Sequence, residues 1–182
     1  AGRFPADTLR VTGSPATLTW KGDGVTNVWD TATTTNWLSA GVPDAFYSGD
    51  YVTFDDSGFN TPAVALVGSV QPNSITVSAT KNYTFAGPGK LSGNGLLTNA
   101  GPGTLTIFTA NDFVGKTFLA GGTLSITNET ALGANPPAFA ADQLTMDGGT
   151  LAIGAATSFR NLNRGITLGV ANGTVSNNLA VT

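Results

Sequence analysis

Residues 101–127 read GPGTLTIFTANDFVGKTFLAGGTLSIT, a stretch in which two short alternating segments each follow a glycine-rich corner. Leu105 and Ile107 are two residues apart in the first segment, and Leu124 and Ile126 have the same spacing in the second. Side chains two apart on a β-strand point to the same face, so each pair is predicted to face the core. Glycine allows the positive φ angles that a sharp corner needs. The stretch therefore predicts short strands joined by tight corners.

The same corner is repeated on both sides of this stretch. Its copies end at five apolar residues that are separated by 14, 19, 27 and 24 residues, namely Leu91, Leu105, Leu124, Leu151 and Val175. One such strand cannot bury its apolar face alone, whereas a second copy stacked on it does so, as in a solenoid. A separation near 20 residues fits one coil of a β-helix, and the step of 14 fits a hairpin or a reduced coil. The repeat therefore predicts a parallel β-helix; a β-sandwich, which also has regular short strands, is the alternative.

The composition agrees with an all-β fold and excludes several kinds of chemistry. Glycine, threonine and asparagine make up more than a third of the 182 residues, and only 10% of the residues are charged. The chain contains neither cysteine nor histidine, so it has no disulfide, no thiol nucleophile, no Ser-His-Asp triad and no zinc site of the usual kind. Eight basic residues against eleven acidic ones argue against binding to nucleic acid, whose phosphates are contacted by Lys and Arg.

The chain divides into a leading segment and one predicted domain. Residues 1–16 contain two prolines and no sustained pattern, which indicates a linker or a short leading strand. Residues 17–182 are predicted to form a single β-helix domain, with an aromatic N-terminal part at 17–60 and repeat coils at 64–182. The sequence has no initiator methionine and no signal peptide, so we expect a segment of a longer protein. No apolar run approaches the length of a membrane span, so no membrane contact is expected.

The stretch at 101–127 resembles the autotransporter-associated β-strand repeat of large bacterial surface and secreted proteins. The resemblance rests on the Gly-x-Gly-Thr-Leu-Thr opening, on Ala-Asn-Asp-Phe-x-Gly at 110–115 and on Gly-Gly-Thr-Leu at 121–124. Residues 147–151 look like a second, partial copy, and the segments WKGDG, WD, NW and GDYVTF between 20 and 54 are similar to the lead-in of such repeats. The resemblance covers about residues 17–175. It implies a right-handed parallel β-helix outside the cell.

Acidic residues are too dispersed in the repeat region to suggest an active site. A glycosidase needs two carboxylates across the scissile bond, and β-helical lyases need an acidic calcium site and a strong base. The repeat region offers Asp112, Glu129, Asp142 and Asp147, each in a different predicted coil or loop. Arg160 and Arg164 have no acidic neighbours in sequence, and we interpret all these groups as solvated surface charges. The chain is therefore predicted not to be an enzyme.

The densest acidic cluster consists of Asp50, Asp55 and Asp56, with Asp30 and Asp44 nearby in sequence. Carboxylates gathered in a loop can bind Ca²⁺, which takes six to eight oxygen ligands. The same residues also begin and end a predicted strand, where acids form turns. We favour the turn interpretation and assign no metal-binding residue, so no cofactor is expected, although a structural Ca²⁺ stays possible.

Aromatic side chains are the candidate binding residues. A sugar ring presents an apolar C–H face that stacks on Trp or Tyr, while its hydroxyls form hydrogen bonds with Asn, Asp and Thr. All three tryptophans fall between residues 20 and 37; we predict that Trp20 belongs to the core or to an aromatic-rich N-terminal cap of the β-helix. Four rings in polar surroundings are predicted to bind carbohydrate, namely Trp29, Trp37, Tyr47 and Tyr51. Three repeat-region rings are expected to stack in the core, namely Phe108, Phe113 and Phe118.

The size, composition and expected fold are also similar to those of β-helical carbohydrate-binding modules attached to secreted polysaccharide-degrading enzymes, some of which bind xylan. That resemblance implies an extracellular, monomeric, non-catalytic module that binds a plant polysaccharide by aromatic stacking and hydrogen bonds. The polysaccharide that it implies is xylan, and the module would target an attached glycoside hydrolase to it. The alternative function is a structural stalk or adhesin segment that binds no ligand. A β-helical lyase or hydrolase ranks third.

Overall fold

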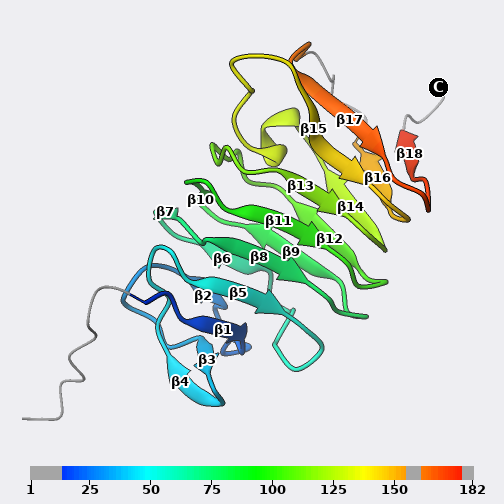
Figure 1. Ribbon diagram of the computed structural model, residues 1–182. Helices are drawn as coiled ribbons and strands as arrows, with labels where there is room; N and C mark the ends of the chain where they lie inside the picture. Colours follow the sequence, from blue (N-terminus) through cyan, green and yellow to red (C-terminus); the bar gives the residue numbers. More distant parts are fainter. Residues whose placement is uncertain (1–13, 155–160, 178–182) are drawn as a thin grey trace, which may run out of the picture.

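The computed structural model describes residues 14–154 and 161–177, and nearly all of their regular structure is β-strand. The strands stack as successive coils of a parallel β-solenoid (Figure 1). The prediction of an all-β parallel β-helix is therefore confirmed. The predicted leading segment at 1–16 lies mostly outside the described residues. Within the described part, the 3-10 helix η1 (Glu129–Leu132) is short, and no helix there is long and apolar enough to cross a membrane.

Two large sheets and one small sheet form the walls of the solenoid. Sheet A has nine strands, in the spatial order β17 (Arg164–Leu168), β15 (Ala140–Met146), β13 (Thr117–Leu119), β11 (Leu96–Asn99), β8 (Ser74–Val77), β5 (Tyr51–Phe54), β1 (Thr17–Trp20), β3 (Trp37–Ser39) and β4 (Val42–Asp44). Sheet B has seven, in the order β18 (Thr174–Asn177), β16 (Thr150–Ile153), β14 (Thr123–Ile126), β12 (Thr104–Ile107), β9 (Tyr83–Ala86), β6 (Val64–Leu66) and β2 (Val28–Trp29). Sheet C pairs β10 (Lys90–Leu91) with β7 (Ser69–Val70).

The predicted repeat register is present in sheet B. Leu105 pairs with Leu124, Leu124 pairs with Leu151, and Leu151 pairs with Val175, in parallel strands. The separations of 19, 27 and 24 residues are therefore single coil steps. Leu105, Leu124 and Leu151 are fully buried, which confirms that the leucine after each of these corners points into the core.

The remaining separation, from Leu91 to Leu105, is neither a hairpin nor a reduced coil, so that interpretation is wrong. Leu91 lies in β10 and pairs with Val70 in sheet C, whereas Leu105 pairs with Tyr83 in sheet B. The two glycine-rich corners look alike in sequence but occupy different edges of the solenoid. The spacing of 14 residues joins two different walls and does not measure a coil.

The core consists of apolar columns that run along the stack. One column of sheet A places Val52, Ile75, Leu97, Thr117 and Leu144 at matching register in consecutive strands. All five side chains are buried. Complete burial of a Val, Ile or Leu side chain stabilises a fold by about 1.5–3 kcal/mol. Since each coil contributes its apolar residues to a shared column, no coil could bury them by itself.

The N-terminal end of the stack is closed by aromatic rings. Here the parallel arrangement stops, because β3 pairs antiparallel with β1 and β4 pairs antiparallel with β3. Trp20, Trp29 and Trp37 are fully buried together with Phe46 and Phe54. The ring centroids of Trp20 and Trp37 are 4.9 Å apart in an edge-to-face arrangement, which aromatic pairs favour. This cluster corresponds to the predicted aromatic-rich cap, and the assignment of Trp20 to it is confirmed.

Two glycines show how closely neighbouring coils approach each other. A Cβ atom built on Gly115 would lie 1.9 Å from the carbonyl oxygen of Gly95 in the adjacent coil. At Gly101 the corresponding distance to the carbonyl oxygen of Ala79 is 2.3 Å. Both distances are far shorter than a van der Waals contact to backbone that cannot swing away. Glycine is therefore needed at these corners for space.

The repeat-region phenylalanines do not share one environment. Phe113 is buried, as predicted, whereas Phe108 and Phe118 are exposed, so the expectation of core stacking is wrong for these two rings. Phe118 lies between Thr117 and Leu119, which both point inward in β13. Since neighbouring residues in a strand face opposite sides, Phe118 has to face the solvent.

Tyr83 makes the stability of the core dependent on pH. Its Oη donates a hydrogen bond of 2.7 Å to the carbonyl oxygen of Asp55, and its ring packs against Phe54. Burial, the largest cause, raises the pKa of the Tyr83 hydroxyl from 10.0 to about 12. The folded state favours the neutral phenol, so its contribution to stability is complete below about pH 10 and is lost as the pH rises through about 12.

We therefore expect the free energy of unfolding to fall between pH 10 and pH 12 more steeply in the wild-type protein than in Tyr83→Phe. Urea denaturation across this range measures both curves. At neutral pH the variant lacks one hydrogen bond, which lowers its free energy of unfolding by about 1 kcal/mol. Because the variant has no phenol at this position to ionise, the difference between the two proteins should shrink as the pH rises toward 12. Parallel curves for the two proteins would contradict the assignment of this titration to Tyr83.

Candidate functional site

The structure separates the four aromatic residues that were predicted to bind carbohydrate. Trp29 and Trp37 are fully buried, and their ring centroids are 5.1 Å apart inside the N-terminal cluster. Neither ring can stack on a sugar, so the assignment of these two residues to an exposed binding surface is wrong. The physical reason is that the polar loops around them fold over the open end of the core. Removing either ring would leave a cavity in the core, so the loss of binding in such a variant would not identify a site.

Tyr47 and Tyr51 are the two predicted rings that reach the surface, with 38% and 42% of their areas exposed. Asp50, which is buried, fixes the turn between them. One oxygen of its carboxylate accepts a hydrogen bond from the backbone N–H of Tyr47, and the other accepts one from Ala16, both at 2.8 Å. The N–H of Tyr51 donates to the carbonyl oxygen of Ala16. The two tyrosines are thus held by the start of sheet A, and their role in binding stays a prediction.

Tyr51 opens onto the outer face of sheet A, which carries a mixture of hydroxyls and exposed apolar side chains. Tyr51, Ser74 and Leu96 follow one another at matching register, and Leu96 is also exposed. The neighbouring column contains Phe118 among five threonines, namely Thr53, Thr76, Thr98, Thr145 and Thr167. Adjacent strands are about 4.8 Å apart, so this face offers a flat, regular row of hydroxyls beside two exposed rings. The residues of these two columns can form hydrogen bonds and stacking contacts, and none of them carries a carboxylate or an amine.

The N-terminal carboxylates form turns, as the turn interpretation expects. Asp55 accepts a hydrogen bond from the backbone N–H of Ser57, Asp44 accepts one from Ala45, and Asp30 accepts one from Thr34. Asp56 accepts hydrogen bonds from the N–H groups of Thr80 and Lys81 in the next coil, and that of Lys81 is the main reason why the pKa of Asp56 is lowered. Among residues 14–154 and 161–177, no three acidic side chains gather in a group that could hold a metal ion.

The surface charges of the repeat region are paired between coils. Lys90 forms an ion pair with Asp112, and Lys116 forms one with Asp142. The hydrogen bond from the lysine is in each case the main reason why the pKa of the aspartate is lowered. A carboxylate held ionised by a lysine is a poor proton donor, so neither aspartate is suited to the role of general acid.

The interpretation of Arg164 as a solvated surface charge is also wrong, because its side chain is buried and forms an ion pair. Its side chain is 1% exposed, and its Nε lies 3.4 Å from Oε1 of Glu129 in η1. The guanidinium also donates hydrogen bonds of 2.8–3.0 Å to the carbonyl oxygens of Leu132, Gly133 and Ala134. Arg164 thus fastens the end of η1 to β17. The role is structural, since every one of these contacts lies within the fold.

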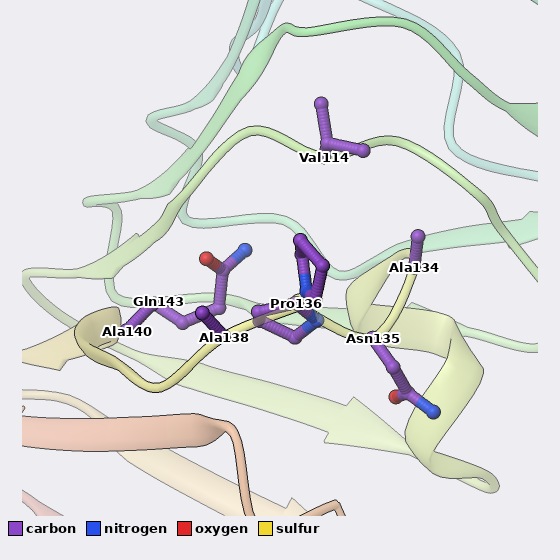
Figure 2. Close-up of a pocket in the computed structure, with 8 residues that line it drawn as sticks. Val114, Ala134, Asn135, Pro136, Ala138, Ala140 and Gln143 are labelled. Carbon is purple, nitrogen blue, oxygen red and sulfur yellow. The ribbon is translucent and has the colours of Figure 1, made fainter.

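One pocket lies beneath the loop that joins η1 to β15. It has a volume of about 240 Å³, and it is lined mainly by apolar side chains that include Val114, Pro136 and Ala138. Figure 2 shows the pocket between the segment that carries Val114 and the loop that carries the two other residues. Asn135 and Gln143 are the polar residues of the lining, and Gln143 donates a hydrogen bond to the carbonyl oxygen of Gly115. The lining contains no ionisable side chain, so the pocket cannot supply acid–base chemistry.

With this geometry in place, comparison with known proteins adds one informative relative. The chain is 29% identical over 158 residues to the adhesin BmaC autotransporter of Brucella suis biovar 1 (strain 1330). The similarity is to an autotransporter adhesin. The match takes in 74% of this chain and 4% of the relative, so the chain corresponds to a small part of a much longer protein. No family model matches the chain, and no solved structure matches it.

Sequence reasoning missed the outer face of sheet A as a unit. Phe118 and Leu96 are exposed there beside Tyr51, but they come from different coils. The alternation in each strand says only that neighbouring residues face opposite sides. Which side is outward depends on the register between coils, and that register depends on loops of unequal length. The two-residue period in each strand was therefore the signal that the sequence offered for this face. It does not identify which side of the sheet faces the solvent.

Proposed function

We propose that this chain forms a rigid, non-catalytic β-solenoid segment of an extracellular adhesin-type protein. The observation that carries the proposal is the unbroken parallel stack from β5 to β17, in which the apolar columns continue from coil to coil. The similarity to an autotransporter adhesin supports the same role. The described carboxylates form turns or pair with Lys and Arg, which argues for a structural role and against an enzyme. In the longer protein, such a segment would hold other regions at a fixed distance.

Rigidity can be tested directly because the sequence contains no cysteine. Thr53 and Thr167 lie in the same outward column of sheet A, five strand steps apart, which places their backbones about 24 Å apart. A Thr53→Cys/Thr167→Cys variant can carry two nitroxide spin labels. Double electron–electron resonance should give one narrow distance distribution. A broad or multiple distribution from a variant with native circular dichroism would argue against a rigid segment.

A second candidate function is carbohydrate binding at the outer face of sheet A. The observation that favours it is that Tyr51 is exposed on the same strand as Thr53, which belongs to the row of outward threonines, and that Tyr47 is also exposed four residues earlier. In this second candidate function, the binding partner is a polysaccharide. The comparisons offer no support for xylan in particular, or for an attached catalytic domain, because the relative is an adhesin.

If this face binds a polysaccharide, Tyr51→Ala should abolish the retardation of the domain in gels that contain the polymer. Because Tyr51 is partly exposed, we expect its replacement to change the free energy of unfolding by less than about 1 kcal/mol. Affinity electrophoresis in xylan, mixed-linkage glucan, xyloglucan and pectin measures the effect. Val42→Ala, an exposed position on β4, is the matched control and should migrate like the wild type. Free migration of the wild-type domain in all four gels would exclude this function for these polymers.

A further inference from the structure

The two ends of the solenoid differ in whether the apolar columns are covered or exposed. At the N-terminal end, the columns finish beneath the buried aromatic cluster. At the other end, three columns continue into the last coil but are no longer covered. In that coil, Ile166 is 43% exposed, Leu168 57% and Val175 53%. The residues before them in the same columns are fully buried, namely Leu144, Met146 and Leu151.

The backbone is open at the same place. Within the described residues, β17 is the outermost strand of sheet A and β18 is the outermost strand of sheet B. Each therefore has a neighbour on one side, and Figure 1 shows both at the end of the stack. An uncovered strand edge offers a row of N–H and C=O groups to which another strand can add. Apolar side chains and unpaired edges thus lie on one surface, which we call the end face.

We propose that the end face binds a further parallel β-coil of the same repeat type. The incoming coil would extend both sheets by one strand and place an apolar side chain over each of Ile166, Leu168 and Val175. The argument is continuity, because every junction from β5 to β17 already uses parallel pairing. The junction of β15 with β17 contains one register shift between Ala140 and Leu144, and its pairing is regular from Leu144 to Met146. The inference extends the proposed structural role and rests on it for its biological setting.

Asn177 at the end face also supports the binding of a further β-coil. Asn177 follows Ile153 at matching register, so it occupies an inward column of sheet B. Asn99 occupies an inward column of sheet A, and its Nδ2 donates a hydrogen bond of 2.9 Å to the carbonyl oxygen of Gly121 in the next coil. An inward asparagine therefore has a ready partner in the backbone of a following coil. Asn177 can make the equivalent bond once a coil lies on it.

A second copy of this chain would fit the end face less well. At the N-terminal end of a copy, sheet A is closed by the antiparallel strands β3 and β4, and sheet B offers only the two-residue strand β2, so this end presents no complete parallel coil. Two end faces that met each other around a two-fold axis would have to pair their strands antiparallel. None of the described coil junctions from β5 to β17 uses antiparallel pairing.

The test is a fusion in which residues 178–182 are replaced by a second copy of residues 155–177. The matched control carries Ile166→Asp, Leu168→Asp and Val175→Asp in the appended copy only. Hydrogen exchange measured by mass spectrometry compares the original β17 and β18 in both fusions. We expect exchange there to be at least about tenfold slower in the apolar fusion, because its coil stacks and the charged one does not.

Equal exchange at β17 and β18 in two fusions with native circular dichroism would overturn the proposal. Sedimentation of the unfused wild-type chain provides a second criterion. A dimer that Leu168→Asp dissociates would show that a second copy covers the end face, which would also overturn it. Neither readout depends on rigidity over the whole stack, which the spin-label distance measures, so failure of this inference and failure of the proposed function are distinguishable.

Discussion

Leu124→Asp is expected to unfold the domain. Leu124 is fully buried between Leu105 and Leu151 in the inward column of sheet B. An aspartate there would place a carboxylate among apolar side chains with no partner, and a buried charge without a partner is among the most costly single changes. We expect a loss of more than about 4 kcal/mol, which is comparable with the whole stability of many domains. Circular dichroism during heating should show no cooperative transition.

The matched control is Ser125→Asp, one residue further along β14. Ser125 faces outward at matching register with Thr106, so its carboxylate would be solvated. We expect this variant to melt within a few degrees of the wild type. Leu151→Asp should behave like Leu124→Asp, because it occupies the same column one coil later. Wild-type melting of either leucine variant would show that the inward assignment is wrong.

Arg164→Ala is the second large effect that we expect. The change would leave the carboxylate of Glu129, of which 12% is exposed, without its ion-pair partner. It would also remove the donors to three carbonyl oxygens at the end of η1, those of Leu132, Gly133 and Ala134. Breaking a buried pair by removing one partner costs about 3–5 kcal/mol. Urea denaturation should therefore show a loss of this size.

Two further variants separate the charge from the hydrogen bonds. Arg164→Lys keeps a positive charge but lacks the planar group that reaches three carbonyl oxygens, so it should recover only part of the loss. Glu129→Gln in the Arg164→Ala background removes the negative charge that the arginine had balanced, and it should restore part of the stability relative to the single variant. A loss below about 1 kcal/mol in Arg164→Ala would contradict the structural role of the pair.

The fold could be predicted because its main signal is local. The alternation of Leu105 with Ile107 and of Leu124 with Ile126 states which residues share a face, and the repeated corners state that the faces stack. Leu91 shows the limit of this reasoning. Its corner shares Gly-Pro-Gly with the one before Leu105, yet it belongs to another wall of the solenoid. Corners with the same Gly-Pro-Gly sequence do not reveal which walls they join.

The surface was harder to predict because burial depends on distant partners. Trp29 and Trp37 lie in polar sequence, and only the arrangement of β1, β3 and the neighbouring coil reveals that they fill the end of the core. Arg164 has no acidic neighbour in sequence, since its partner Glu129 lies in the preceding coil. The exposure of Tyr51 could be predicted because the alternation within its own short strand places it on the face opposite to Val52 and Phe54, which are buried.

From β8 onward, the connections that lead from sheet A to sheet B stay short, whereas the return connections from sheet B to sheet A vary in length. Residues 100–103, 120–122 and 147–149 make the same corner in successive coils, but the return from η1 to β15 needs residues 133–139. Evolution can therefore lengthen this return, and a protein engineer can do the same, without altering the register of either sheet. A peptide epitope inserted between Pro136 and Pro137 would be displayed on a scaffold whose coils keep their pairing.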